Sequence, residues 1–144
     1  MIRIERDETF PFIKDDTVRP ELTMSFRTQD GREVYGLYND DDAIKAVICV
    51  AYTTQVPITV KELEEFSLIP DHATIAIFYT VWSYQNGAGR EIIFTIRKHL
   101  EAYRPNIKRF VTLSPKTEMA YRFHTRNGAI QVGKNKESDN YEYL

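Results

Sequence analysis

The chain has 144 residues, of which 42% are hydrophobic and 28% are charged, a composition that predicts one globular domain over residues 1–144. Its net charge of −2 argues against a general nucleic-acid-binding protein, because such proteins carry a basic surplus. No apolar run is long enough to span a bilayer, the acidic start Met1–Glu8 does not fit a signal peptide, and the single Cys49 can form no internal disulfide. We therefore expect a cytoplasmic protein with no membrane partner.

The first half of the chain is expected to form mainly strands. Residues of Leu22–Arg27 alternate between apolar and polar types, and Asp30-Gly31 follows as a hairpin turn signal. An antiparallel meander is therefore predicted over residues 22–53. The expected strands of this meander are Leu22–Arg27, Val34–Tyr38 and Ala43–Thr53. A short strand, Phe10–Ile13, is expected before it. A short helix is predicted over Val60–Phe66, with Thr59 as its N-cap.

The second half of the chain alternates strands with helices. Ala73–Trp82 is an apolar, β-branched run that predicts an interior strand. Gly89–Tyr103 carries an apolar stripe at helical spacing. The further expected elements are a strand over Lys108–Leu113, a helix that Ser114 caps and that ends at Arg126, and strands over Ala129–Gly133 and Asn140–Leu144. The predicted fold is a mixed α/β (α+β) one, with a mostly antiparallel central sheet flanked by helices.

The loop Gln85–Arg90 joins the expected central strand to the first long helix. A strand that turns through glycines into a helix directs bare backbone N–H groups and the positive end of a helix dipole at one point. Gly87 and Gly89 permit a sharp turn and a close approach, and Arg90 adds a charge-assisted contact. The loop is therefore a candidate phosphate site, although a glycine pair before a helix is also a common simple turn.

Two segments of this half carry a family resemblance. The loop reads Tyr84-Gln85-Asn86-Gly87-Ala88-Gly89, and the second helix reads Thr117-x-x-Ala120-x-x-x-His124-x-x-x-Gly128-Ala129. With this order of elements, residues 34–133 resemble the GNAT superfamily of acyl-CoA N-acyltransferases. Tyr84 departs from the Arg or Gln usual in that family, and His124 stands where many members have a tyrosine.

The resemblance implies positions for a bound acetyl-CoA or another acyl-CoA. The end of the central strand should pair with the pantetheine arm, the glycine loop should hold the pyrophosphate, and residues near the second helix should contact the cofactor. The implied cofactor-binding residues are Thr80, Val81, Trp82, Ser83, Gln85, Asn86, Gly87, Ala88, Gly89, Arg90, Ser114, Thr117 and Phe123.

The resemblance also implies catalytic roles. His124 occupies the position of the group that protonates the departing thiolate, and an imidazole titrates near neutrality. The central strand carries no carboxylate to act as a base, so Tyr79 and Ser83 are the candidates to orient a water. No metal is implied.

The expected activity is transfer of an acetyl group from acetyl-CoA to a primary amine, by direct attack in a ternary complex. The amine can belong to a small molecule, a protein or a peptide, and no nucleic-acid partner is expected. The residues before position 20 offer little from which to form the first helices usual in this family, which often build the acceptor site. The resemblance therefore implies an open acceptor cleft or one completed by a homodimer. Two alternatives remain: a GNAT-fold acyl-CoA sensor without chemistry, and a protein-interaction module in which the glycines only form a turn.

Overall fold

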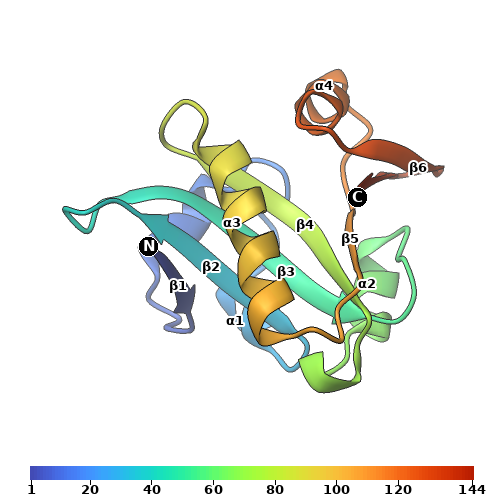
Figure 1. Cartoon of the computed structure of the whole chain (residues 1–144), viewed down its shortest axis with the longest axis horizontal. Helices are drawn as coiled ribbons and strands as arrows, with labels where there is room; N and C mark the ends of the chain where they lie inside the picture. Colours follow the sequence, from blue (N-terminus) through green and yellow to red (C-terminus); the bar gives the residue numbers. More distant parts are fainter.

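The computed structural model describes all 144 residues, which form a seven-stranded sheet with the strand order β1-β2-β3-β4-β5-β7-β6 (Figure 1). The strands are β1 (Ile2–Glu5), β2 (Arg32–Tyr38), β3 (Ile44–Thr53), β4 (Ile75–Ser83), β5 (Arg109–Thr112), β6 (Ile130–Lys134) and β7 (Asp139–Tyr143). The α-helices are α1 (Met24–Thr28), α2 (Val60–Phe66), α3 (Ala88–Tyr103) and α4 (Glu118–Arg126), and the 3-10 helices are η1 (Pro11–Asp15) and η2 (Pro70–His72).

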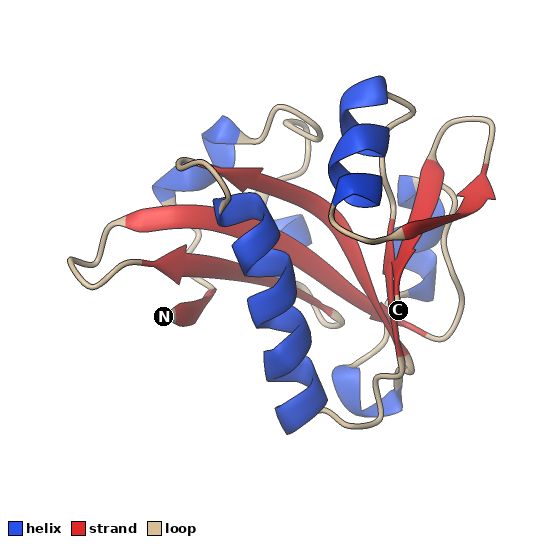
Figure 2. Cartoon of the chain, turned by 45° about the horizontal axis from the view of Figure 1, so that its top comes forward, coloured by secondary structure: helices blue, strands red, loops and turns tan.

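The sheet is mixed and mostly antiparallel, as the sequence predicts. Only β4 and β5 pair in parallel, and every other neighbouring pair is antiparallel. Each face of the sheet has its own apolar core. Helix α3 crosses one face (Figure 2), whereas side chains of η1, α1 and α2 pack into the core on the other.

Helix α3 begins after Gly87 and is held on the sheet by one buried stripe. Gly87 is its N-cap at φ 80°, a left-handed conformation that glycine adopts without strain. Ile92, Ile93, Ile96 and Leu100 are fully buried, as the spacing predicts. Burying a side chain of this size contributes about 1.5–3 kcal/mol, so this stripe fixes α3, and with it the preceding loop, against β4.

Strand β4 is the element that opens the sheet. It pairs with β5 only from Ile75 to Phe78, and beyond the bond from the Leu113 N–H to the Phe78 carbonyl (3.1 Å) the two strands separate. Figure 1 shows them side by side at one end and apart at the other. The pairing of β4 with β3 shifts by one residue between Cys49 and Val50. This bulge leaves Tyr79 as the extra residue and turns the end of β4 away from β5.

The first thirty residues differ from the prediction. Leu22–Arg27 is not a strand: the Thr23 hydroxyl accepts a hydrogen bond from the Phe26 N–H (3.1 Å) and starts helix α1. Phe10–Ile13 is not a strand either, because Pro11 opens the 3-10 helix η1. The meander therefore begins at Arg32, and the short strand β1 pairs with β2 at its edge. Alternation over six residues fits either structure, and here the N-cap hydrogen bond decides for the helix.

The start of α4 also differs from the prediction. Thr117, not Ser114, is the N-cap: its hydroxyl accepts a hydrogen bond from the Ala120 N–H at 3.1 Å. Ser114 instead forms an isolated bridge with Asp139, with backbone bonds of 2.9 and 3.0 Å. The expected strands of β2, β3, β4, β5, β6 and β7, and the helices α2 and α3, are confirmed within a few residues at each end.

Candidate functional site

A cleft of about 320 Å³ lies where β4 and β5 separate. Its walls come from the end of β4, the segment after β5, the first turns of α4 and Thr17-Val18 of the N-terminal segment. The predicted site residues that line it are Tyr79, Thr80, Val81, Trp82, Ser83, Gly89, Ser114, Thr117, Phe123 and His124. The other predicted residues, Gln85, Asn86, Gly87, Ala88 and Arg90, continue from Ser83 in the loop that leaves the cleft. One fork in the sheet thus gathers residues from two distant stretches of the sequence.

The loop presents free backbone donors. The N–H groups of Asn86, Gly87, Gly89 and Arg90 make no hydrogen bond within the chain, whereas the Ala88 N–H donates to the Gln85 carbonyl at 3.1 Å. No side chain caps the 16-residue helix α3. Free N–H groups at the positive end of a helix dipole form an anion site. The loop therefore keeps the donors that the sequence predicts for a phosphate, with Ala88 as the exception.

Gly89 brings this loop against α4. A Cβ atom at Gly89 would lie 3.2 Å from Cζ of Phe123, tighter than ordinary packing, and 3.9 Å from the Ser83 hydroxyl oxygen. The absent side chain therefore lets Phe123 close one wall of the cleft. His124 follows Phe123 directly, so the loop and the imidazole line the same space.

His124 is held uncharged. Only 6% of the residue is exposed, its ring stacks on Tyr141 with centroids 5.1 Å apart, and its Nδ1 lies 2.7 Å from the Tyr143 hydroxyl oxygen. Burial lowers the pKa of His124 from 6.5 to about 4. The side chain is therefore a neutral imidazole at pH 7, not the imidazolium that a pKa near neutrality would allow.

Tyr143 is a partner that the sequence analysis missed. Burial raises the pKa of its phenol, so the hydroxyl keeps its proton. When that hydroxyl donates to Nδ1 of His124, the imidazole proton resides on Nε2, the other ring nitrogen. Tyr143 lies 19 residues from His124, and nothing in the local sequence points to their contact.

Tyr79 enters the site differently from the expectation. Its ring packs in the core on the α1 side of the sheet, edge-on to Phe26 with centroids 6.5 Å apart. Its hydroxyl is buried without a hydrogen-bond partner, and burial raises its pKa well above 10. A phenol in this place does not orient a water in the cleft, so Tyr79 contributes through its backbone at the bulge.

A buried ion pair anchors the N-terminal segment beneath the cleft. Asp16 and Arg27 lie 2.7 Å apart with both side chains fully buried, and Asp16 also accepts a hydrogen bond from the Thr80 hydroxyl at 2.8 Å. Burial by itself raises the pKa of Asp16, but hydrogen bonds from the Arg19 N–H, Arg27 and Thr80 lower it overall. The segment is thus tied directly to β4.

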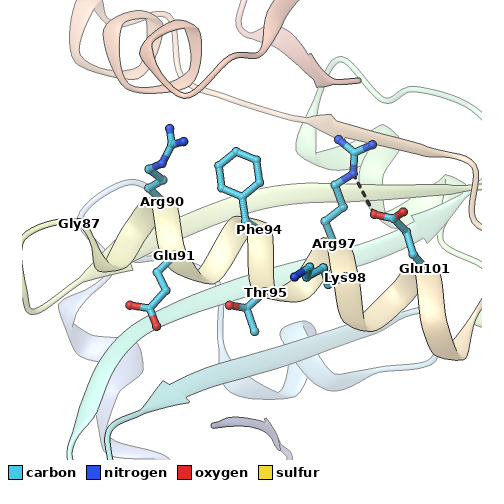
Figure 3. Close-up of a pocket in the computed structure, with 8 residues that line it drawn as sticks. All are labelled: Gly87, Arg90, Glu91, Phe94, Thr95, Arg97, Lys98 and Glu101. Carbon is cyan, nitrogen blue, oxygen red and sulfur yellow. Dashed lines mark hydrogen bonds and ion pairs between the residues drawn. The ribbon is translucent and has the colours of Figure 1, made fainter.

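A larger hollow of about 670 Å³ follows the outer face of α3 (Figure 3). Its lining residues are Gly87, Arg90, Glu91, Phe94, Thr95, Arg97, Lys98 and Glu101. The Arg90 guanidinium stacks 4.8 Å from the centre of the Phe94 ring, and Arg97 pairs with Glu101 at 3.1 Å. One helix supplies the whole lining, so this hollow lacks the converging walls of the cleft. It begins at Gly87 and Arg90 of the same loop whose Gly89 lines the cleft.

Two other kinds of site are absent from the structure. No group of three or more His, Cys, Asp or Glu side chains is arranged to hold a metal ion. None of the helices combines the length and the apolar character that crossing a membrane requires.

The chain matches no protein-family model and no curated protein. Solved structures do resemble it. An acetyltransferase of Bacillus subtilis in complex with CoA is 9% identical with a TM-score of 0.66, over 99% of this chain and 98% of that one. A GNAT-family acetyltransferase of Listeria monocytogenes is 9% identical with a TM-score of 0.55, over 76% of this chain and 63% of that one.

A second group of similar structures consists of much longer proteins. Malonyl-CoA decarboxylase of Agrobacterium vitis is 24% identical with a TM-score of 0.67, over 85% of this chain but 35% of the decarboxylase. This chain therefore spans about a third of that enzyme. Taken with the forked sheet, the bulged β4 and the glycine loop at the start of α3, these comparisons show that the chain has a GNAT-like fold.

Proposed function

We propose that the cleft between β4 and β5 binds an acyl-CoA and that the protein transfers its acetyl group to a primary amine. The observation that carries this proposal is the loop Gln85–Arg90. It presents unpaired N–H groups at the start of α3 and continues directly from the strand that lines the cleft. The CoA-bound acetyltransferase of similar fold supports the same ligand class.

The proposed ligand occupies both the cleft and the hollow along α3. The pyrophosphate lies on the N–H groups of the loop, and the pantetheine arm extends along the free edge of β4 from Thr80 to Ser83. The nucleotide lies at the opposite end, over the hollow that starts at Gly87 and Arg90. Arg90 then offers a positive charge, held in place by its stacking on Phe94 and by a hydrogen bond to Asn127 (3.2 Å).

The proposed transfer is a direct one. The amine nitrogen attacks the thioester carbonyl carbon, the C–S bond breaks, and an amide and CoA thiol result. The Val81 N–H polarises the thioester oxygen. As Nε2–H of the neutral His124 gives its proton to the thiolate, the Tyr143 hydroxyl proton passes to Nδ1. The proton that the amine releases then returns through water and restores the phenol. No carboxylate lines the cleft, so the amine loses its proton to water near Ser83, and amines of modest pKa are favoured.

A second candidate is decarboxylation of a malonyl-type CoA thioester. The decarboxylase of similar fold is 24% identical to this chain, against 9% for the acetyltransferases. The cleft has a proton donor and no carboxylate base, which suits this reaction. The C–C bond to the carboxylate breaks, carbon dioxide leaves, and the thioester enolate takes a proton to give acetyl-CoA. No amine acceptor is needed.

Calorimetry with CoA and acetyl-CoA tests ligand binding first. We expect micromolar binding to the wild type and none to Gly89→Trp, because the new side chain fills the space between the loop and Phe123. Gly128→Asn is the control: a Cβ at Gly128 meets no atom within 4 Å, and asparagine tolerates the positive φ of this position. Wild-type protein that binds neither ligand would contradict the proposal.

Turnover assays then separate the candidates. Thiol release from acetyl-CoA only in the presence of an amine supports acetyl transfer. Release of carbon dioxide from malonyl-CoA without an amine supports decarboxylation. Tight binding with neither reaction identifies an acyl-CoA sensor and contradicts both enzymatic proposals.

A further inference from the structure

Arg19 bridges the two strands at the point where the sheet forks. Its Nε donates to the Tyr79 carbonyl of β4 at 3.1 Å, and its Nη2 donates to the Leu113 carbonyl after β5 at 3.0 Å. Both carbonyls belong to residues that line the cleft. One guanidinium from the N-terminal segment therefore joins strands that no longer pair with each other.

The bridge replaces the next step of the β ladder. The last bond between the strands runs from the Leu113 N–H to the Phe78 carbonyl. The Leu113 carbonyl is the acceptor that a continued ladder would use, and Arg19 occupies it instead. The planar guanidinium thus holds β4 and β5 one side chain apart, where direct pairing would close the cleft.

The backbone of Arg19 is itself fixed. Its N–H donates to Oδ1 of Asp16 at 3.1 Å, and its carbonyl accepts from Nη2 of Arg27 at 2.7 Å. The buried pair of Asp16 and Arg27 therefore fixes the position of the Arg19 backbone, from which the Arg19 side chain reaches the fork. Arg19 forms no ion pair with a carboxylate. Its guanidinium donates to the two carbonyls instead.

We propose that Arg19 is a positioning residue that holds β4 and β5 apart and so keeps the cleft open for the pantetheine arm. This inference rests on the proposed acyl-CoA binding. The two halves of the ligand use different parts of the site: the nucleotide half contacts the glycine loop, whereas the pantetheine half needs the fork. Loss of the bridge closes or loosens the fork and leaves the loop unchanged.

The test compares two ligands by calorimetry on the wild type and on Arg19→Met, which keeps the side-chain stem and removes the guanidinium. We expect the Kd for CoA to rise at least about tenfold, because two charge-assisted hydrogen bonds are lost. The Kd for the nucleotide half of CoA, with its diphosphate, stays unchanged. An equal loss for both ligands, or no loss for CoA, would overturn the proposal.

Two further variants keep the test decisive. Arg19→Lys retains the charge but has no planar guanidinium that can donate to two carbonyls, so we expect it to weaken CoA binding too. Full CoA binding by Arg19→Lys would overturn the proposed bridge, even if Arg19→Met does not fold. Arg104→Met is the control, since Arg104 pairs with Glu33 at 2.8 Å away from the cleft; we expect lower stability and unchanged CoA binding. Absence of CoA binding by the wild type would refute the proposed function itself.

Discussion

His124, which lines the cleft, forms a buried, uncharged pair with Tyr143. Burial removes the charged form of the imidazole from the pH range in which histidine usually titrates. A proton that leaves Nε2 for a thiolate therefore comes from a neutral ring. The burial of His124 and its contact with Tyr143 cannot be predicted from the sequence. The helical spacing predicts the position of His124, but Tyr141 and Tyr143, which pack against its ring, belong to the distant strand β7.

The stability of the fold should depend on His124 in mild acid. Between pH 6.5 and about pH 4 the unfolded chain binds a proton at this residue and the folded chain does not, so the free energy of unfolding falls as the pH falls. The loss amounts to about 3 kcal/mol. Urea unfolding from pH 7 to pH 4 measures it, and His124→Gln should flatten the curve. Carboxylates whose pKa values folding lowers, such as Glu33 and Glu142, contribute equally in both proteins, so the difference between the two curves isolates His124. An unchanged curve in the variant would show that His124 does not titrate as described.

Tyr143→Phe isolates the contribution of the hydroxyl to chemistry. The variant keeps the ring that packs against Phe94 and His124 but removes the partner of Nδ1. We expect kcat for acetyl transfer to fall at least about tenfold with the Kd for CoA unchanged, because general acid catalysis contributes more than this. Steady-state kinetics and calorimetry together measure the split. A rise in Kd with unchanged kcat would assign Tyr143 to binding instead.

At the scale of elements, the parts that position the cleft follow from sequence patterns and the parts that close it do not. The stripe of α3, the apolar run of β4 and the turn at Gly87 each carry a periodicity or a residue type that predicts them. The N-terminal segment carries no such signal. In the sequence, Arg19 looks like part of an extended break before Pro20. Only folding brings it to the fork, beside Tyr79 and Leu113, which lie 60 and 94 positions further along the chain.

Helix α1 is short enough that its N-cap should matter. Thr23→Ala removes the acceptor for the Phe26 N–H, and loss of such a cap costs about 1 kcal/mol. Urea unfolding should show this loss, whereas Ser25→Ala, an exposed change in the same helix, should be neutral or slightly stabilising because alanine favours helices. A Thr23→Ala variant as stable as the wild type would show that the Thr23 hydroxyl does not stabilise α1 as a cap.

At the scale of the whole molecule, the two faces of the sheet are coupled through β4. The core on the α3 face supports the glycine loop, and the core on the α1 face supports the segment that reaches the fork. The coupling passes through polar groups buried at the bulge: Asp16 joins Arg27, Thr80 and the N–H of Arg19. A buried charge pair of this kind binds its neighbours tightly only while both charges are present.

Asp16→Asn should therefore be among the most damaging single changes in the chain. It leaves the Arg27 guanidinium buried without a counter-charge, and breaking such a pair costs about 3–5 kcal/mol. Urea unfolding measures this loss, and Arg27→Met in the same chain should restore much of it, since the double variant removes both charges. Glu118→Gln breaks the exposed pair with Arg122 and should change little. If the double variant is no more stable than Asp16→Asn alone, the cost lies in the Asp16 hydrogen bonds to the N-terminal backbone and to Thr80, and the charge pair is not what joins the two faces.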